Sequence, residues 1–283
     1  MPTILSCTDG SIYAPSVCDH TAWAALRLGA EVHVLHLLEH SESPAPADVS
    51  GTIGIDAQSA LLSELVALAE TQGRLAQAKA RALLDQAKGQ LANAGIAKVV
   101  IEQQHGALVD SIERFEATAD LVVIGKRGEH ADFAKLHLGS NLERVIRSCH
   151  HPVLVASRVF NPIDRFLIAF DGGPSAKKAV AYVASQPLLK GLSCHLITAA
   201  SSRSALSDEL AAAHHQLTEA GYSVTAKQIA GDPEAVIADE VKRLEINLLV
   251  MGAYGHSRIR KFIVGSTTTS LVRTCTIPLL LFR

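Results

Sequence analysis

The sequence predicts an α/β fold: two tandem, doubly wound domains, each built on a five-stranded parallel sheet. Short runs rich in Val, Ile and Leu alternate with alanine-rich amphipathic segments, a pattern typical of βαβ units whose helices cover both faces of a sheet. This pattern occurs twice along the 283 residues. Apolar residues make up 48% and charged residues 19%, which is enough apolar surface for two cores.

The two copies align through landmarks at nearly constant offsets. TILSCTDGS at 3–11 matches RFLIAFDGG at 165–173, which sets Asp9 against Asp171, 162 residues later. The offset falls to 125 where Gly106 matches Gly231, so the first copy holds about 37 extra residues between its second and third strands. Later landmarks keep offsets of 126 or 127. We therefore assign residues 1–157 to a first copy with a long insert and residues 163–283 to a second copy.

The elements follow from the apolar runs and the helical periodicity between them. In the first copy we expect strands near 3–8, 31–37, 98–104, 120–125 and 152–156. In the second copy they are expected near 166–170, 193–199, 223–229, 246–252 and 277–282. The predicted helices are 14–28, 57–94, 107–117, 140–149, 175–190, 205–220, 233–244 and 266–275.

The insert at 57–94 carries leucines mostly at helical spacing. One interpretation is a long helix packed on the sheet, or a helix broken at Gly73. The other is a lid or a dimer arm. The sequence leaves both open.

Composition narrows the function classes. The net charge of −2 gives no basic excess for binding nucleic acid. No apolar run approaches the roughly 20 residues of a membrane span, and we see no signal peptide, so we expect a cytoplasmic protein. The five cysteines form no CxxC pair and are expected to be reduced. No HExxH motif occurs, and no histidine metal site is predicted.

Three features of the second copy should meet at one edge of its sheet. Ligands of open α/β sheets bind beyond the carboxyl ends of the strands, where the strand order reverses. Gly252-Ala-Tyr-Gly255 follows the fourth strand, Gly265-Ser266-Thr267 opens the next helix, and Asp171-Gly172-Gly173 follows the first strand. The glycine loop has the spacing G-x2-G-x9-G-S.

This spacing suits a bound polyphosphate. Glycines let the backbone approach a ligand closely, and Gly-Ser at a helix start presents N–H groups and the positive end of the helix dipole. The intervening HSRIRKFIV, which begins at His256, adds two arginines and a lysine, although these can equally form a solvated basic loop. The loop is neither a P-loop nor the dinucleotide fingerprint.

On these residues the chain resembles a tandem universal stress protein, and the resemblance covers nearly all of both copies. It implies sheets of strand order 3-2-1-4-5 that pair through 152–157 and 279–282 as a built-in pseudo-dimer. It also implies an ATP site, with Mg²⁺ as a further ligand near Asp171.

The resemblance assigns the parts of that site residue by residue. Gly252 and Gly255 would lie against ribose and phosphates, and the backbone of Thr198 and Ala199 would face adenine. Asp171 would lie near the ribose or Mg²⁺. The expected cofactor-binding residues are Asp171, Gly172, Thr198, Ala199, Gly252, Gly255, His256, Gly265, Ser266 and Thr267.

The first copy departs from this pattern. Ten residues, rather than nine, separate Gly128 from Gly139, and Lys126 and Arg127 stand between the glycines. These cations could add charge to a second anion site, or they could replace a ligand in a degenerate one. Both hypotheses stay open for the candidate residues Asp9, Gly125, Gly128, Gly139 and Ser140.

The preferred function is an adenine-nucleotide-binding protein of stress response or regulation, with protein partners that the sequence does not identify. We find no general base or nucleophile, so no catalytic residue is assigned and any ATP hydrolysis should be slow. One alternative is a ligand-free interaction module. Another is an ATP-pyrophosphate-splitting enzyme, whose SGGxDS-type loop is echoed only poorly at 171–175. Whether two chains associate is left open.

Overall fold

The computed structural model describes residues 1–38, 55–106, 108–116, 118–126, 140–199, 207–253 and 266–283. The elements of the first copy are β1 (Thr3–Thr8), α1 (Ala14–Leu28), β2 (Glu31–Leu38), α2 (Ile55–Asn93), β3 (Val99–His105), α3 (Leu108–Glu116), β4 (Leu121–Gly125), α4 (Ser140–Ser148) and β5 (Val153–Ala156). Those of the second copy are β6 (Arg165–Ala169), α5 (Pro174–Ser185), η2 (Pro187–Leu189), β7 (Ser193–Ala199), α6 (Ser207–Glu219), β8 (Val224–Ile229), α7 (Pro233–Arg243), β9 (Leu248–Gly252), α8 (Ser266–Thr274) and β10 (Leu279–Phe282).

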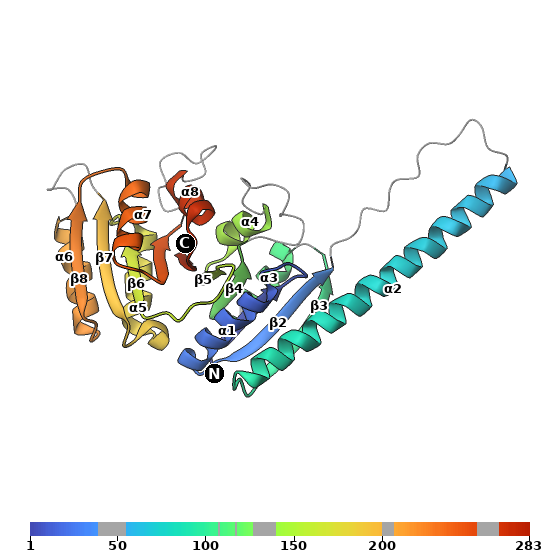
Figure 1. Cartoon of the computed structure of the whole chain (residues 1–283), viewed down its shortest axis with the longest axis horizontal. Helices are drawn as coiled ribbons and strands as arrows, with labels where there is room; N and C mark the ends of the chain where they lie inside the picture. Colours follow the sequence, from blue (N-terminus) through green and yellow to red (C-terminus); the bar gives the residue numbers. More distant parts are fainter. Residues whose placement is uncertain (39–54, 107, 117, 127–139, 200–206, 254–265) are drawn as a thin grey trace.

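All ten strands form one sheet of order β3-β2-β1-β4-β5-β10-β9-β6-β7-β8. Each copy therefore has the order 3-2-1-4-5, with helices on both faces (Figure 1). The pairing register repeats as the sequence offset predicts: Cys7 pairs with Leu35, and Ala169 with Ile197, 162 residues further on in both strands. The predicted fold class is confirmed.

The two copies join through their last strands. β5 and β10 pair antiparallel, with Leu280 opposite Leu154, while the other neighbouring strands of the sheet run parallel. Both leucines are fully buried in a core cluster that also contains residues of α1 and α5. A second cluster covers the other face and likewise spans both copies. Each core is thus shared across the junction.

Two helices differ from expectation. The helix predicted at 175–190 ends at Ser185 and is followed by a separate 3₁₀ turn, because Pro187 holds Gln186 in an extended conformation. α2 runs unbroken through Gly73, so that glycine is not a break. Only the carboxyl-terminal part of α2 packs on the sheet, through Ala80, Leu84, Ala87 and Leu91, and the rest projects away from it (Figure 1).

Among the described residues, no helix combines the length and the apolar character that crossing a membrane requires.

Candidate functional site

The candidate site lies where the strand order of the second copy reverses. The chain passes from β6 outward to β7 and β8, then returns to β9 on the other side of β6. Ala169 near the end of β6 pairs with Met251 near the end of β9. Asp171 and Gly252 therefore follow neighbouring strands at the same carboxyl edge, as the sequence predicts for a ligand crevice.

Asp171 forms a turn at this edge. Its Oδ1 accepts a hydrogen bond of 2.9 Å from the backbone N–H of Gly173, and Gly172 has a φ of 73°. In the first copy, Asp9 Oδ1 accepts from Ser11 N–H at 3.0 Å in the same way. Both aspartates thus make Asx turns that lead into the following helix. The turn fixes where the Asp171 carboxylate lies, at the start of α5.

Gly252 is required by packing. A Cβ added there would lie 2.9 Å from the backbone nitrogen of Ala176 and 2.9 Å from Ser175 Cβ, both in the first turn of α5. The absence of a side chain lets β9 and the start of α5 meet. This contact explains the glycine without a ligand, and the sequence did not reveal it.

Small residues end β7 at the same carboxyl edge of the sheet. Thr198 is 0% exposed, and its Oγ1 has no hydrogen-bond partner among the described residues. Ala199 follows on the opposite face of the strand. The matching positions of the first copy hold His36, whose Nδ1 lies 3.0 Å from the carbonyl oxygen of Thr8, and Leu37. The second copy therefore has smaller side chains at the end of this strand.

The helices that follow the glycine loops differ in charge. The first turn of α8 contains no acidic residue, and neither does that of α5. The first turn of α4 contains Glu143, which pairs with Arg147 at 2.8 Å. Because a carboxylate at a helix N-terminus competes with a bound anion for the same dipole and N–H groups, the first turn of α8 opposes an anion less than that of α4 does.

Part of the predicted site cannot be placed. Gly255, His256, Gly265, Gly128 and Gly139 lie outside the described residues. Three further residues, Ser266, Thr267 and Ser140, begin described helices, but their side chains are outside the described part of the chain.

Lys126 joins the two copies. This residue follows Gly125 at the end of β4, is buried, and donates from Nζ to the backbone carbonyl of Cys275, beyond the end of α8. Its ammonium is therefore used in a contact between the copies, which favours a structural role for it. The signal in the sequence is that a lysine stands where the second copy has Ala253.

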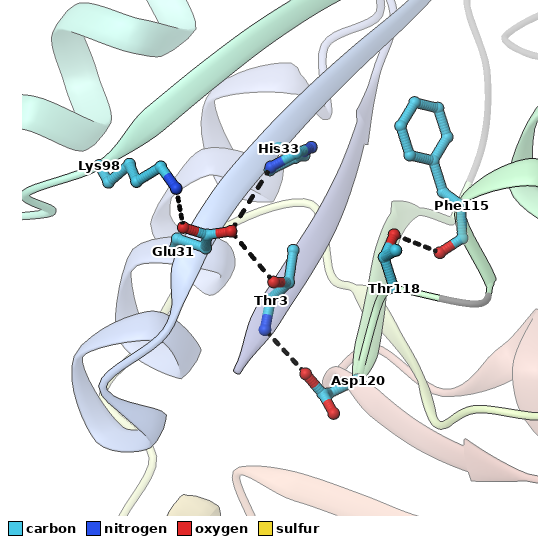
Figure 2. Close-up of polar contacts among 7 residues, drawn as sticks. All are labelled: Thr3, Glu31, His33, Lys98, Phe115, Thr118 and Asp120. Carbon is cyan, nitrogen blue, oxygen red and sulfur yellow. Dashed lines mark hydrogen bonds and ion pairs between the residues drawn. The ribbon is translucent and has the colours of Figure 1, made fainter. Parts of the chain in front are cut away.

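A polar cluster joins the amino-terminal ends of strands in the first copy. Figure 2 shows Glu31 contacted by Lys98, by Thr3 Oγ1 at 3.3 Å and by His33 Nε2 at 3.8 Å. Thr3 N–H also donates to Asp120 Oδ2 at 2.8 Å. These contacts tie β1, β2 and β4 together at their amino ends, far along the strands from the candidate site.

Four of the five cysteines are poor nucleophiles. Burial raises the pKa of Cys18 to about 11 and that of Cys194 to about 12, and it also raises the pKa values of Cys7 and Cys275. These four thiols stay protonated near neutral pH. Within the described ranges, no group of three or more His, Cys, Asp and Glu side chains is arranged to hold a metal ion.

Comparison with known proteins identifies the family. The model of the universal stress protein family matches the chain twice, over residues 1–157 and 162–283. The chain belongs to the universal stress protein family. Universal stress protein Slr1230 from Synechocystis sp. is 38% identical over 288 residues, covering 100% of both proteins.

Other relatives extend the comparison. Universal stress protein MJ0531 from Methanocaldococcus jannaschii is 29% identical over 155 residues, which cover 53% of this chain and 79% of that protein. The crystal structure of a universal stress protein from Archaeoglobus fulgidus superposes with a TM-score of 0.74 at 20% identity, covering 99% of this chain and 96% of that one. This last similarity shows that the two chains share their fold over almost their whole length.

Proposed function

We propose that this universal stress protein binds an adenine nucleotide, ATP, in its second copy and acts in stress response or regulation in the cytoplasm. The observation that carries the proposal is the pair of helices α5 and α8. They follow the two strands that flank the reversal of strand order, and neither has an acidic residue in its first turn. The first copy lacks this feature because Glu143 lies in the first turn of α4.

Each part of the nucleotide has a matching group. The phosphates would lie at the N-terminus of α8, held by Gly255, His256 and the Gly265-Ser266-Thr267 segment. The carboxyl-terminal end of β7 has small side chains, at Thr198 and Ala199, which leave room for the adenine ring beside them. The orphaned hydroxyl of Thr198 supplies a hydrogen-bonding group at this position.

Mg²⁺ fits the same arrangement. Protein sites commonly hold this ion through one or two carboxylates together with substrate phosphates and waters, so no cluster of side chains is needed. Asp171, set by its Asx turn, is the carboxylate we assign to it, with Gly172 allowing the turn. When bound, Mg²⁺ would neutralise part of the phosphate charge.

We expect binding rather than catalysis at this site. Neither a general base nor a nucleophile is assigned to it. We therefore expect ATP hydrolysis to be slow, and ATP occupancy to alter the surface that protein partners meet.

The first experiment identifies any nucleotide that is bound to the purified protein. Nucleotide released from freshly purified, denatured protein is identified by mass spectrometry, and the emptied protein is titrated with ATP, ADP and AMP by calorimetry. ATP bound at one site per chain supports the proposal. An empty protein with no affinity for any of the three favours a ligand-free interaction module. Rapid ATP turnover with a second substrate favours an enzyme.

Exchanging residues between the copies tests which copy binds. Thr269→Glu copies Glu143 into α8. We expect it to weaken ATP binding about fivefold, because a negative carboxylate at the helix N-terminus reduces the free energy of binding the negative phosphates there by about 1 kcal/mol. Ala199→Leu copies Leu37 and should reduce affinity by filling space beside the ring. Glu143→Thr is the matched control in the first copy and should leave the affinity for ATP unchanged. If Glu143→Thr changes affinity while Thr269→Glu does not, the site has been assigned to the wrong copy.

A further inference from the structure

The amino-terminal part of α2 leaves the body of the protein. From Ser63 to Lys79 every residue is exposed, and Ala80 is the first buried residue of the helix. Figure 1 shows this part extending well beyond the sheet, whereas the last turns lie along β2 and β3. From Ile55 to Lys79 the projecting part measures about 37 Å at 1.5 Å per residue.

This projecting part exposes large apolar side chains. Leu65 is 41%, Leu68 is 55% and Leu75 is 66% exposed, and Val66 lies beside them. With Gln72, the three leucines follow the alternating three- and four-residue spacing of a helix-pairing seam. Isolated helices are marginal in water, and helices in proteins owe most of their stability to tertiary packing. We therefore expect the exposed leucines of this arm to pack against a partner.

The charges along the arm indicate which partner fits. On the face that carries the leucines, the acidic Glu64 lies toward the start of the arm and the basic Lys79 lies at its base. Two arms running antiparallel would set the acidic part of each beside the basic part of the other. Two parallel arms would set like charges together. Antiparallel pairing also opposes the two helix dipoles favourably.

We propose that residues 55–79 form a dimerisation arm that pairs antiparallel with the same arm of a second chain. The arms cross near Gln72, which lies on the same face of the helix as the three leucines. In this arrangement Leu68 of each chain packs beside Leu75 of the other, and Glu64 lies near Lys79 of the other chain. The dimer uses no residue of the nucleotide site, so it stands or falls independently of ATP binding.

Sedimentation across a range of concentrations tests the association. The wild-type protein should pass from monomer to dimer, and Leu68→Ser with Leu75→Ser should weaken self-association about tenfold or more, as removal of anchor residues from an interface does. Leu26→Ser is the matched control, because this α1 leucine is 58% exposed but lies away from the arm. A wild type that stays monomeric at every concentration overturns the proposal, as does a dimer that the double variant leaves intact.

The orientation is tested separately. Glu64→Lys and Lys79→Glu should each weaken the dimer, and the two together should restore it. Differently tagged Leu68→Cys and Leu75→Cys chains, mixed and oxidised, should cross-link with each other more than either does with itself. The wild-type chain controls for its native cysteines, most of which are buried. Preferential Leu68→Cys self-linking would show parallel arms and refute the arrangement.

Discussion

Gly252 shows how a single residue can carry two explanations. Its position after β9 suggests a glycine that admits a ligand. Its contacts with Ser175 and Ala176 show a glycine that admits the neighbouring helix. The second explanation holds whether or not ATP is bound, so a variant at this position changes the packing of β9 on α5 as well as any nucleotide site.

We expect Gly252→Ala to destabilise the protein by about 1–3 kcal/mol, because the added methyl group must displace backbone atoms of α5. Gly89→Ala is the matched control. Gly89 lies inside α2 with open space around it, so alanine there should stabilise by up to about 1 kcal/mol. Urea denaturation of both variants measures the difference. Equal stability of Gly252→Ala and wild type would show that the strand and helix are not in contact as described.

His20 is a buried base in α1. It is 0% exposed, and its Nδ1 lies 2.7 Å from the carbonyl oxygen of Ser16. Its ring contacts the ring of Phe160, which lies between the two copies, edge-on at 4.9 Å. Burial lowers its pKa from the ordinary 6.5, against smaller opposite effects of the Ser16 carbonyl and Asp19. The folded protein thus holds this imidazole in its neutral form.

A pH dependence follows with a definite sign. The unfolded chain binds a proton at His20 once the pH falls below about 6.5, whereas the folded chain resists it, so stability is lost as the pH falls from 6.5 toward the folded pKa. We expect the free energy of unfolding of wild type to decrease more between pH 7.5 and 5.5 than that of His20→Gln. If the free energy of unfolding depends on pH equally in the two proteins, His20 binds a proton equally well in the folded and unfolded states. Denaturant titrations at each pH provide the measurement.

At the scale of elements, the sequence predicted all ten strands and most helices because their apolar runs are strongly periodic. The boundaries differ where a local contact intervenes. β9 begins at Leu248, two residues later than expected, and Asn247 just before it accepts hydrogen bonds at Oδ1 from the N–H groups of Asp164 and Arg165. β10 begins after Pro278, which has no N–H to donate to a neighbouring strand.

The course of α2 could not be predicted in the same way. Leucines at three- and four-residue spacing suit a helix on a sheet and a helix paired with another helix equally well. The length of α2 that packs on the sheet depends on how far β2 and β3 extend beneath it. This extent is set by the pairing of β2 with β3 and not by the sequence of the helix.

The candidate site was predictable in its location and less so in its contacts. Repeat offsets and strand-end glycines placed Asp171 and Gly252 at one edge, and the structure brings them there. Lys126 and Cys275 are 149 residues apart, and no local pattern shows that they meet. Whether a glycine serves packing or a ligand depends on neighbours that are distant in sequence.

At the scale of the whole molecule, the junction between the copies is built like the interior of one domain. β5 and β10 continue the sheet, and both core clusters cross it. Side chains also donate across it to backbone carbonyls, as Lys178 Nζ does to His150 at 2.6 Å and Arg283 does to Arg147. Loss of structure in one copy would expose the buried strand of the other, so the two should unfold together.

The single tryptophan, Trp23, makes this cooperativity measurable because it lies in the first copy. Leu217 lies in α6 of the second copy, is 0% exposed, and is far along the sheet from the junction. We expect Leu217→Ala to destabilise the chain by about 2–5 kcal/mol and to shift the Trp23 fluorescence transition as much as the circular dichroism transition. Gln216→Ala, on the exposed side of the same helix, should change stability by less than about 0.5 kcal/mol. If Trp23 unfolds at the wild-type midpoint in Leu217→Ala while part of the circular dichroism signal is lost earlier, the copies unfold separately and the shared sheet does not couple them.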